Sequence, residues 1–339
     1  MLHYFRKARI RIHSGDDMIT MTEIARLTNV SQPTVSRVLN GNQNVAAEIR
    51  ERVLACAKEH NYQCNALAKG LQGSRTMLLG VLLTDISNSF FADLAKKLES
   101  EARRSGHSII LFNSDYDMDK EQAYLDVVRR YRVDGVLAAP ILQEGSAWPE
   151  CAHRLDIPVV VMTRRMEGVD SVYLDHTAAS GQVARHLAER GYQRFLFIGK
   201  NYDMKYMGFY QSLDELGLAD RLESMEYVDD RQLQEDLRAY FQQSGPRAGV
   251  FANNDICALR VLRQLRVLGI SVPQEAGVVG FDDTYMGPYL NPSLTSISQP
   301  TGQIAAEAVS RLLYRMDNPG RLPALDLALP AELVVRESS

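Results

Sequence analysis

Two groups of side chains in this sequence stand where they could do chemistry, and the first lies within residues 19–40, which read ITMTEIARLTNVSQPTVSRVLN. Apolar residues recur there at helical spacing, so Gln32, Thr34, Ser36 and Arg37 are left on the outer side of a short helix. These side chains offer donors and acceptors to base edges, and arginine can form two hydrogen bonds with guanine in the DNA major groove. The pattern favours DNA recognition, although an amphipathic helix pair on an ordinary domain surface would show the same periodicity.

The second group consists of polar, cationic and aromatic side chains that follow predicted strands. Carboxylate, amide and cationic groups beside an aromatic ring suit a small hydroxylated ligand, bound by paired hydrogen bonds and by stacking. The ordinary alternative is structural, because Asp and Asn also cap helices and a Phe at a helix start can belong to the core. The candidates are Asp85, Ser87, Phe90, Thr163, Arg164, Lys205, Asn254 and Asp282.

No pattern typical of an enzyme or a metal site accompanies these groups. The sequence contains no G-x-S-x-G, no H-E-x-x-H and no G-x-G-x-x-G after a predicted strand. The four cysteines form no C-x-x-C pair and have no histidine at zinc spacing, so we expect buried thiols in a reducing compartment. We therefore expect no enzymatic activity, no cofactor and no metal.

Three short helices must position the first group. Thr20 and Glu23 form a T-x-x-E capping box, which marks the start of a helix. After a turn, Ser31 can cap a second helix with Pro33 in its first turn, where the missing N–H costs nothing. A third helix is predicted over residues 47–60, and together the three helices make a minimal core.

Charge is unevenly distributed along the 339 residues, whose formal net charge is −4. Residues 1–76 hold 11 Lys and Arg against 6 Asp and Glu, whereas the remainder holds 27 against 36. A basic head on an acidic body directs only the head toward phosphates. Residues 1–18 carry no pattern of their own, and we expect a disordered arm there unless Met18 is the true start.

No apolar run approaches the roughly 18 residues of a membrane span. The N-terminus is basic, but no apolar core of a signal peptide follows it. We therefore expect a cytoplasmic protein without a membrane partner.

From Met77 onward the sequence alternates between β and α patterns. This alternation predicts two lobes, each a parallel sheet with helices on both faces. Ligands bind such sheets in the crevice at the carboxyl ends of the strands. Strands are expected at residues 77–83, 108–112, 135–139, 159–162, 172–174, 195–199, 225–228, 249–252 and 277–280, and helices at 91–104, 120–131, 178–190, 206–216, 231–243 and 256–268.

Several blocks of the sequence resemble a known family. VSQPTVSRVLNG is similar to the V-S-x-x-T-V-S-R-V-L-N motif of the lactose-repressor (LacI/GalR) family, and NALAKGL at residues 65–71 is similar to its hinge. FANND (251–255), GFDD (280–283) and LTSI (294–297) resemble its ligand-binding core, which is similar to periplasmic sugar-binding proteins. The resemblance covers residues 19 to about 336. One departure is Cys64, where the family usually has Pro.

The resemblance implies a transcription regulator that binds an inverted-repeat operator as a homodimer, and we expect it to be a repressor. The hinge would become helical only on DNA, and Leu71 would wedge into a base step from the minor groove. The expected DNA-binding residues are Thr20, Ser31, Gln32, Pro33, Thr34, Ser36, Arg37, Asn40, Asn65, Ala68 and Leu71.

The resemblance also implies the domain organisation. An all-α helix-turn-helix headpiece (residues 19–63) and a hinge (64–75) would precede an α/β core (76–339) of the type I periplasmic-binding-protein kind. No heptad run follows the last strand, so nothing would build a tetramer from dimers. The N-lobe would comprise residues 76–175 and 293–322, and the C-lobe residues 176–292 and 323–339.

Two departures from the family concern the expected ligand. Its sugar-binding members often carry Asp where Thr163 stands and Arg where Lys205 stands. The crevice would lose an acidic group and keep cations at Arg164 and Lys205, so we hypothesise an anionic effector such as a sugar acid or sugar phosphate. The alternatives are a solute-binding transport protein, which the basic headpiece argues against, and a regulator controlled by a protein corepressor.

Overall fold

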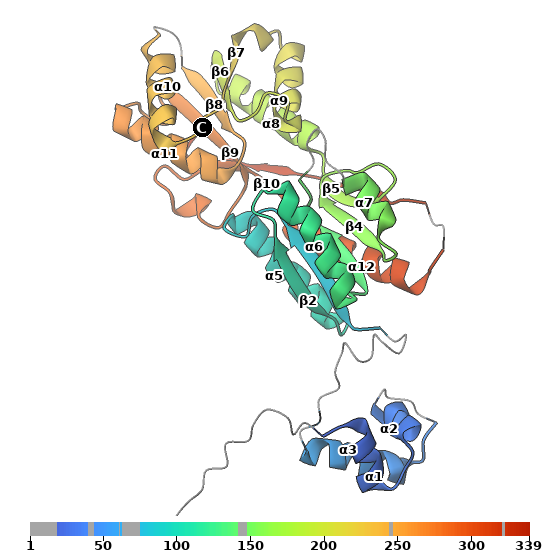
Figure 1. Ribbon diagram of the computed structural model, residues 1–339. Coiled ribbons are helices and arrows are strands. Elements are labelled where there is room, and N and C mark those ends of the chain that lie inside the picture. The colour runs from blue at the N-terminus through green and yellow to red at the C-terminus, as the bar shows by residue number, and fades with distance from the viewer. Residues whose placement is uncertain are drawn as a thin grey trace, which may run out of the picture. The chain divides into compact units, whose positions relative to one another are not determined.

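Figure 1 shows the computed structural model, which describes residues 19–39, 44–60, 62, 75–141, 148–243, 247–320 and 323–339. The chain divides into two units, residues 1–76 and residues 77–339. The arm expected at residues 1–18 and nearly all of the expected hinge lie outside the described residues.

Three helices form the described part of the first unit: α1 (Met21–Thr28), α2 (Gln32–Leu39) and α3 (Ala47–Glu59). The predicted capping box is present at the start of α1. The hydroxyl of Thr20 accepts a hydrogen bond from the amide of Glu23 at 3.2 Å, and the Glu23 carboxylate accepts one from the amide of Thr20 at 2.7 Å. These bonds satisfy amides that a helix start otherwise leaves free.

The three helices enclose a small apolar core to which each contributes two buried side chains. Because α2 buries Val35 and Val38, its opposite side must face outward, and Gln32 and Arg37 are exposed there. The buried residues are Ile24, Ala25, Val35, Val38, Val53 and Ala57.

The first sheet of the second unit has the order β11-β5-β4-β3-β1-β2, and all its pairings are parallel in the described residues. Alternate strand residues join two apolar cores. One core includes α5 (Ser89–Arg104) and α12 (Thr301–Asp317), and the other includes α6 (Met118–Tyr131) and α7 (Trp148–Arg154) (Figure 1). The strands are β1 (Leu78–Leu83), β2 (Ser108–Asn113), β3 (Gly135–Ala138), β4 (Val159–Thr163), β5 (Asp170–Leu174) and β11 (Asp326–Leu329).

The second sheet has the order β12-β10-β9-β8-β6-β7 and is parallel except for the antiparallel pair of β10 and β12. One face packs on α8 (His176–Glu189) and α9 (Met204–Glu215), and the other on α10 (Asp230–Gln242) and α11 (Asp255–Leu268). Two sheets covered on both faces confirm the predicted fold class. The strands are β6 (Arg194–Ile198), β7 (Leu222–Met225), β8 (Ala248–Ala252), β9 (Ala276–Asp282), β10 (Thr295–Ser298) and β12 (Glu332–Val334).

The chain passes between the sheets later than the expected lobe boundaries. β10 pairs with β9 and so belongs to the second sheet, whereas the expected boundary lay before residue 293. β11 pairs with β5 in the first sheet, although its residues were expected in the C-lobe. The second and third crossings therefore follow β10 and β11, because pairing partners rather than local pattern decide which sheet a strand joins.

Five elements were absent from the sequence-based prediction and one was displaced. Three of the missing elements are strands of only three or four residues, which carry little pattern. The missing elements are α7, β10, α12, β11 and β12, and β7 begins three residues before the strand expected at 225–228.

Asp170, at the start of β5, ties the returning segments to the first sheet. Its carboxylate is 3 % exposed and accepts hydrogen bonds from Arg315 at 2.6 and 2.9 Å, from Arg311 at 3.0 Å and from the amide of Leu325 at 2.7 Å. Burial acts to raise the pKa of Asp170, but the bonds from Arg315 and Arg311 hold it below its usual value. One buried anion thus fixes α12 and the approach to β11.

Asp170→Ala should lower the free energy of unfolding at neutral pH by about 3 kcal/mol, because two half-buried arginines would lose their anion. The lowered pKa means that this contribution exists above the unfolded-state pKa and disappears as pH falls through the folded-state value. Urea denaturation should therefore show a difference between variant and wild type that narrows in strongly acidic buffer. Asp326→Ala, which breaks an exposed pair with Arg165, should cost less than about 1 kcal/mol. Equal effects of the two substitutions would contradict this account.

Candidate functional site

The outer side of α2 carries the side chains predicted to read DNA. Gln32, Pro33 and Arg37 are exposed, whereas Thr34 and Ser36 are half-buried. The hydroxyls of Ser31 and Thr34 lie 2.8 Å apart at the start of the helix. The face therefore combines an arginine and an amide with short hydroxyl groups, a set that can contact both base edges and phosphates.

Other predicted DNA-binding residues lie apart from this face or outside the described residues. Thr20 is exposed, and its hydroxyl both caps α1 and donates to Glu23 at 2.9 Å. Its place is therefore explained by helix capping. Four predicted DNA-binding residues lie outside the described residues: Asn40, Asn65, Ala68 and Leu71.

A cleft of about 1070 Å³ lies in the second unit at the carboxyl ends of strands from both sheets. Segments after β1, β3, β4, β6, β8 and β9 all contribute to its lining. The structure brings six of the eight predicted effector-binding residues together there: Phe90, Thr163, Arg164, Lys205, Asn254 and Asp282.

Asp85 and Ser87 are not among the lining residues. The Asp85 carboxylate accepts a hydrogen bond from the amide of Ser87 at 2.8 Å, and its carbonyl accepts one from the amide of Asn88 at 3.2 Å. The two predicted residues thus build the turn between β1 and α5. Asn88 instead lines the cleft, and its side chain caps α5 by accepting from the amide of Phe90 at 3.0 Å.

Several lining residues were missed by the sequence analysis. Tyr116 follows β2 and has a positive φ of 56°. Because the other candidates were chosen for following predicted strands, the same criterion could have identified Tyr116. Gln299 follows β10, which was not predicted, so no signal pointed to it. Lys200, Tyr202 and Asp203 lie between β6 and α9, within reach of the same rule.

Lys205 places a largely buried ammonium in the cleft. Its Nζ donates to the carbonyl of Asn253 at 2.6 Å and lies 3.9 Å from the centre of the Phe281 ring. Burial lowers the pKa of Lys205, and the carboxylates of Asp282 and Asp203 act in the opposite direction. The cation therefore has a carbonyl and an aromatic face as direct partners, and two acids nearby.

Asp282 is the buried acid at the end of β9. Burial raises its pKa to about 7, while Lys205 acts to lower it. Its Oδ1 accepts a hydrogen bond from the side-chain amide of Gln299 at 2.7 Å. At neutral pH this carboxyl group therefore exists in both protonation states, and it can accept from or donate to a ligand hydroxyl.

His176, the first residue of α8, remains neutral in the cleft. It stacks on Phe281 with ring centres 5.5 Å apart, and burial together with Lys205 and Arg164 lowers its pKa to about 3. The cleft thus contains no histidine cation at physiological pH.

A second buried acid, Asp255, holds the strained turn that presents Asp282. Asp282 and Asp283 have positive φ values of 120° and 49°. The Asp255 carboxylate accepts from the amide and hydroxyl of Thr284 at 2.6 and 3.0 Å and from the hydroxyl of Ser296 at 2.5 Å. A strained backbone persists only where its surroundings hold it, and these bonds supply that restraint.

The packing beside Asp255 leaves no space for another side chain. A Cβ added to Gly280 would lie 2.3 Å from the Asp255 carboxylate. The neighbouring Asn254 caps α11 by accepting from the amide of Cys257 at 2.8 Å, so its amide group remains the part available to a ligand.

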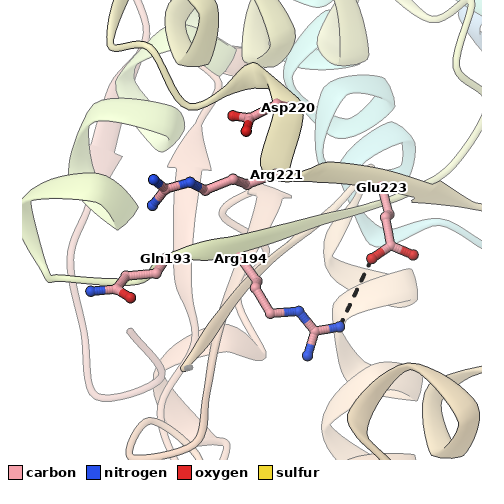
Figure 2. Close-up of a pocket in the computed structure, with 5 residues that line it drawn as sticks. All are labelled: Gln193, Arg194, Asp220, Arg221 and Glu223. Atoms are coloured by element: carbon pink, nitrogen blue, oxygen red, sulfur yellow. Dashed lines mark ion pairs between the residues drawn. The ribbon is translucent and has the colours of Figure 1, made fainter. Parts of the chain in front are cut away.

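A smaller hollow of about 410 Å³ lies at the amino-terminal ends of β6 and β7 (Figure 2). Arg194 reaches away from Arg221 toward Glu223, at 3.8 Å, and donates to the carbonyl of Tyr240 at 3.1 Å. Its guanidinium also lies 4.1 Å from the centre of the Tyr240 ring. The arginine is therefore engaged by protein groups, and none of the predicted site residues lines this hollow.

Within the described residues, no group of three His, Cys, Asp or Glu side chains is arranged to hold a metal ion. In the same part of the chain, no helix is both long enough and apolar enough to cross a membrane.

Comparison with known proteins gives matches over both units. Residues 20–65 match the model for bacterial regulatory proteins of the lacI family, and residues 184–339 match that for a periplasmic binding protein-like domain. The ribose operon repressor of Halalkalibacterium halodurans is 31 % identical over 328 residues, which cover 95 % of this chain and 97 % of that protein.

Many solved structures are similar to the chain, including those of two regulators. The lac repressor dimer bound to operator and the anti-inducer ONPF has a TM-score of 0.83 at 22 % identity, covering 94 % of this chain and 98 % of that one, which shows the shared fold. A periplasmic binding protein/LacI transcriptional regulator from Alkaliphilus metalliredigens QYMF, complexed with D-xylulofuranose, has a TM-score of 0.67 at 28 % identity. It covers 78 % of this chain and 99 % of that one.

The chain thus has an outward polar face on α2 and a cleft at the strand ends of both sheets. It is also 31 % identical to a relative over almost its full length. The chain belongs to the LacI family of bacterial regulatory proteins, which are transcription regulators and not enzymes.

Proposed function

We propose that this protein is a cytoplasmic repressor that binds an inverted-repeat operator as a homodimer and responds to a small, hydroxylated, anionic effector. The observation that carries the proposal is the presence in one chain of a polar DNA-facing helix and of a cleft lined by hydrogen-bonding and cationic groups. The effector can shift the affinity for DNA only as far as it binds two states of the core unequally.

On the DNA side, Arg37 is proposed to contact guanine or phosphate, with Gln32 and Thr34 nearby in the major groove. The buried Val35 and Val38 fix which side of α2 faces out, so Gln32 and Arg37 are exposed and Thr34 lies half-buried at the edge of that side. The proposed roles of Asn40, Asn65, Ala68 and the wedge Leu71 rest on the family motif alone.

On the effector side, the helix starts around the cleft support an anionic ligand. The N-terminal residues or caps of α5, α8, α9 and α11 line it, and a helix N-terminus carries partial positive charge. Lys205 and Arg164 add two positive charges to the cleft. The acids there are Asp203 and Asp282, and the pKa of Asp282 is raised to about 7. An anion would therefore improve the charge balance of the cleft.

The names of similar proteins support the sugar part of the proposal. One relative is a ribose operon repressor, and a similar solved regulator holds D-xylulofuranose. A pentose or hexose carrying a carboxylate or phosphate would combine hydroxyl groups for Asn254 and Asp282 with a negative charge for Lys205. D-ribose and D-ribose 5-phosphate make a matched pair of probes, because they differ only in the phosphate.

Arg37→Ala should weaken binding to the operator and relax discrimination at one base position by about 1–3 kcal/mol. The operator would first be selected from random DNA, and affinities for it and for single-base variants would then be compared by gel shift. The control is Arg52→Ala, which removes an exposed arginine from α3 of the same headpiece. An Arg37 variant that discriminates between bases as the wild type does would contradict the proposed contact.

Lys205→Gln should reduce the affinity for D-ribose 5-phosphate by roughly tenfold or more, since a charge-assisted bond would be lost. Binding of D-ribose should change much less. Calorimetry on the full chain would measure both, and Lys200→Gln, at an exposed position on the cleft, serves as the control. Tight binding of neutral sugars alone, unaffected by Lys205→Gln, would refute the anionic effector.

A further inference from the structure

Glu121 is a buried acid outside the residues so far assigned to the cleft. It lies in the first turn of α6 and is 3 % exposed. Its carboxylate accepts a hydrogen bond from the amide of Ile141, with distances of 3.0 and 3.4 Å to the two oxygens. Burial raises the pKa of Glu121 to about 7, while the hydrogen bond from the Ile141 amide and the nearby Trp148 indole act to lower it.

The charged residues around Glu121 are engaged with other groups. On α6, Lys120 lies 3.3 Å from Asp115, and the Asp117 carboxylate accepts from the amides of Asp119 and Lys120. On α7, Glu150 and Arg154 form an exposed ion pair at 2.8 Å. Among the described residues no ion pair includes Glu121, and the donor bonded to its carboxylate there is the neutral amide of Ile141.

Ile141 and Trp148 belong to different parts of the first sheet's surroundings. Ile141 follows β3, and residues 139–141 form one wall of the cleft. Trp148 is the first residue of α7 and is 3 % exposed within the core that α6 and α7 share. The Glu121 carboxylate therefore joins the wall of the cleft to α6, and the Trp148 indole of α7 lies close enough to influence that carboxylate.

We propose that Glu121 is a positioning residue for the effector: its carboxylate, beside the Trp148 indole, holds residues 139–141 in place through the Ile141 amide. This inference rests on the proposed use of the cleft as the effector site. An occupant that moves the wall moves the Ile141 amide relative to the carboxylate, and so changes the balance between the charged and neutral forms of Glu121.

Trp148 makes the inference measurable, because it is the only tryptophan in the chain. In the full-length protein, tryptophan emission should show a transition near pH 7 that is absent in Glu121→Gln. Asp119→Asn, an acid-to-amide change at an exposed position in the same helical turn, should keep the transition. Wild-type emission without a transition, or an unchanged transition in Glu121→Gln, would overturn the link to Trp148.

The link to the cleft is tested with D-ribose 5-phosphate. Its addition should change tryptophan emission in the wild type. Glu121→Gln, which can still accept from Ile141, should bind the probe within about threefold of wild type at one chosen pH, with a flatter pH profile of affinity. Glu121→Ala leaves that buried amide without its acceptor and should bind roughly tenfold more weakly. Normal affinity in a folded Glu121→Ala variant, or binding heat without a change in emission, would overturn the proposal.

Failure of the proposed effector is distinguishable from failure of this inference. If D-ribose 5-phosphate gives no heat and releases no operator in gel shift, the anionic effector is wrong. Hydrogen exchange at the Ile141 amide then still decides the role of Glu121: faster exchange in Glu121→Ala than in Glu121→Gln supports it, and equal exchange refutes it. Thermal melting of both variants identifies any general loss of folding.

Discussion

The ammonium group of Lys205 is the constraint on which the chemistry of the cleft depends. Burial removes it from water, and its direct partners are the carbonyl of Asn253 and the face of Phe281. Asp282 stands nearby, but burial raises its pKa to about 7, so this carboxyl group is only partly charged at neutral pH. A buried charge with incomplete compensation is costly, and a ligand that brings an anion relieves that cost. The preference we propose for an acidic sugar thus follows from what the protein leaves unsatisfied.

The segments that pass from one sheet to the other carry some of the side chains that line the cleft. Gln299 lies between β10, in the second sheet, and α12, on the first, and it donates to Asp282 in the cleft. Asp170 then fixes α12 to β5 through two arginines. The Asp282 carboxylate therefore contacts a segment that connects the two sheets. A shift from one arrangement of the core to another must occur at such connections.

Features set by neighbouring residues could be predicted from the sequence, and features set by distant contacts could not. The capping box and the outer side of α2 follow from spacing, and six of the eight effector-binding residues predicted from strand ends line the cleft. Asp85 does not line the cleft, and its carboxylate instead builds a turn with the next residues. Gln299 was missed because β10, which it follows, was not predicted. In the sequence, Glu121 cannot be distinguished from the other acidic residues of an amphipathic helix. Its burial depends on α7 and Ile141, which only the folded chain brings to it.

Position 280 must remain glycine, and this limits which substitutions can alter the ligand preference of the protein. Any larger residue there would collide with Asp255, which holds the turn that presents Asp282. The end of β9 is therefore a fixed reference point in the binding site. In laboratory evolution of biosensors from this scaffold, libraries that randomise Gly280 would consist mainly of inactive clones. New ligand preferences would have to arise across the cleft, at positions such as Thr163.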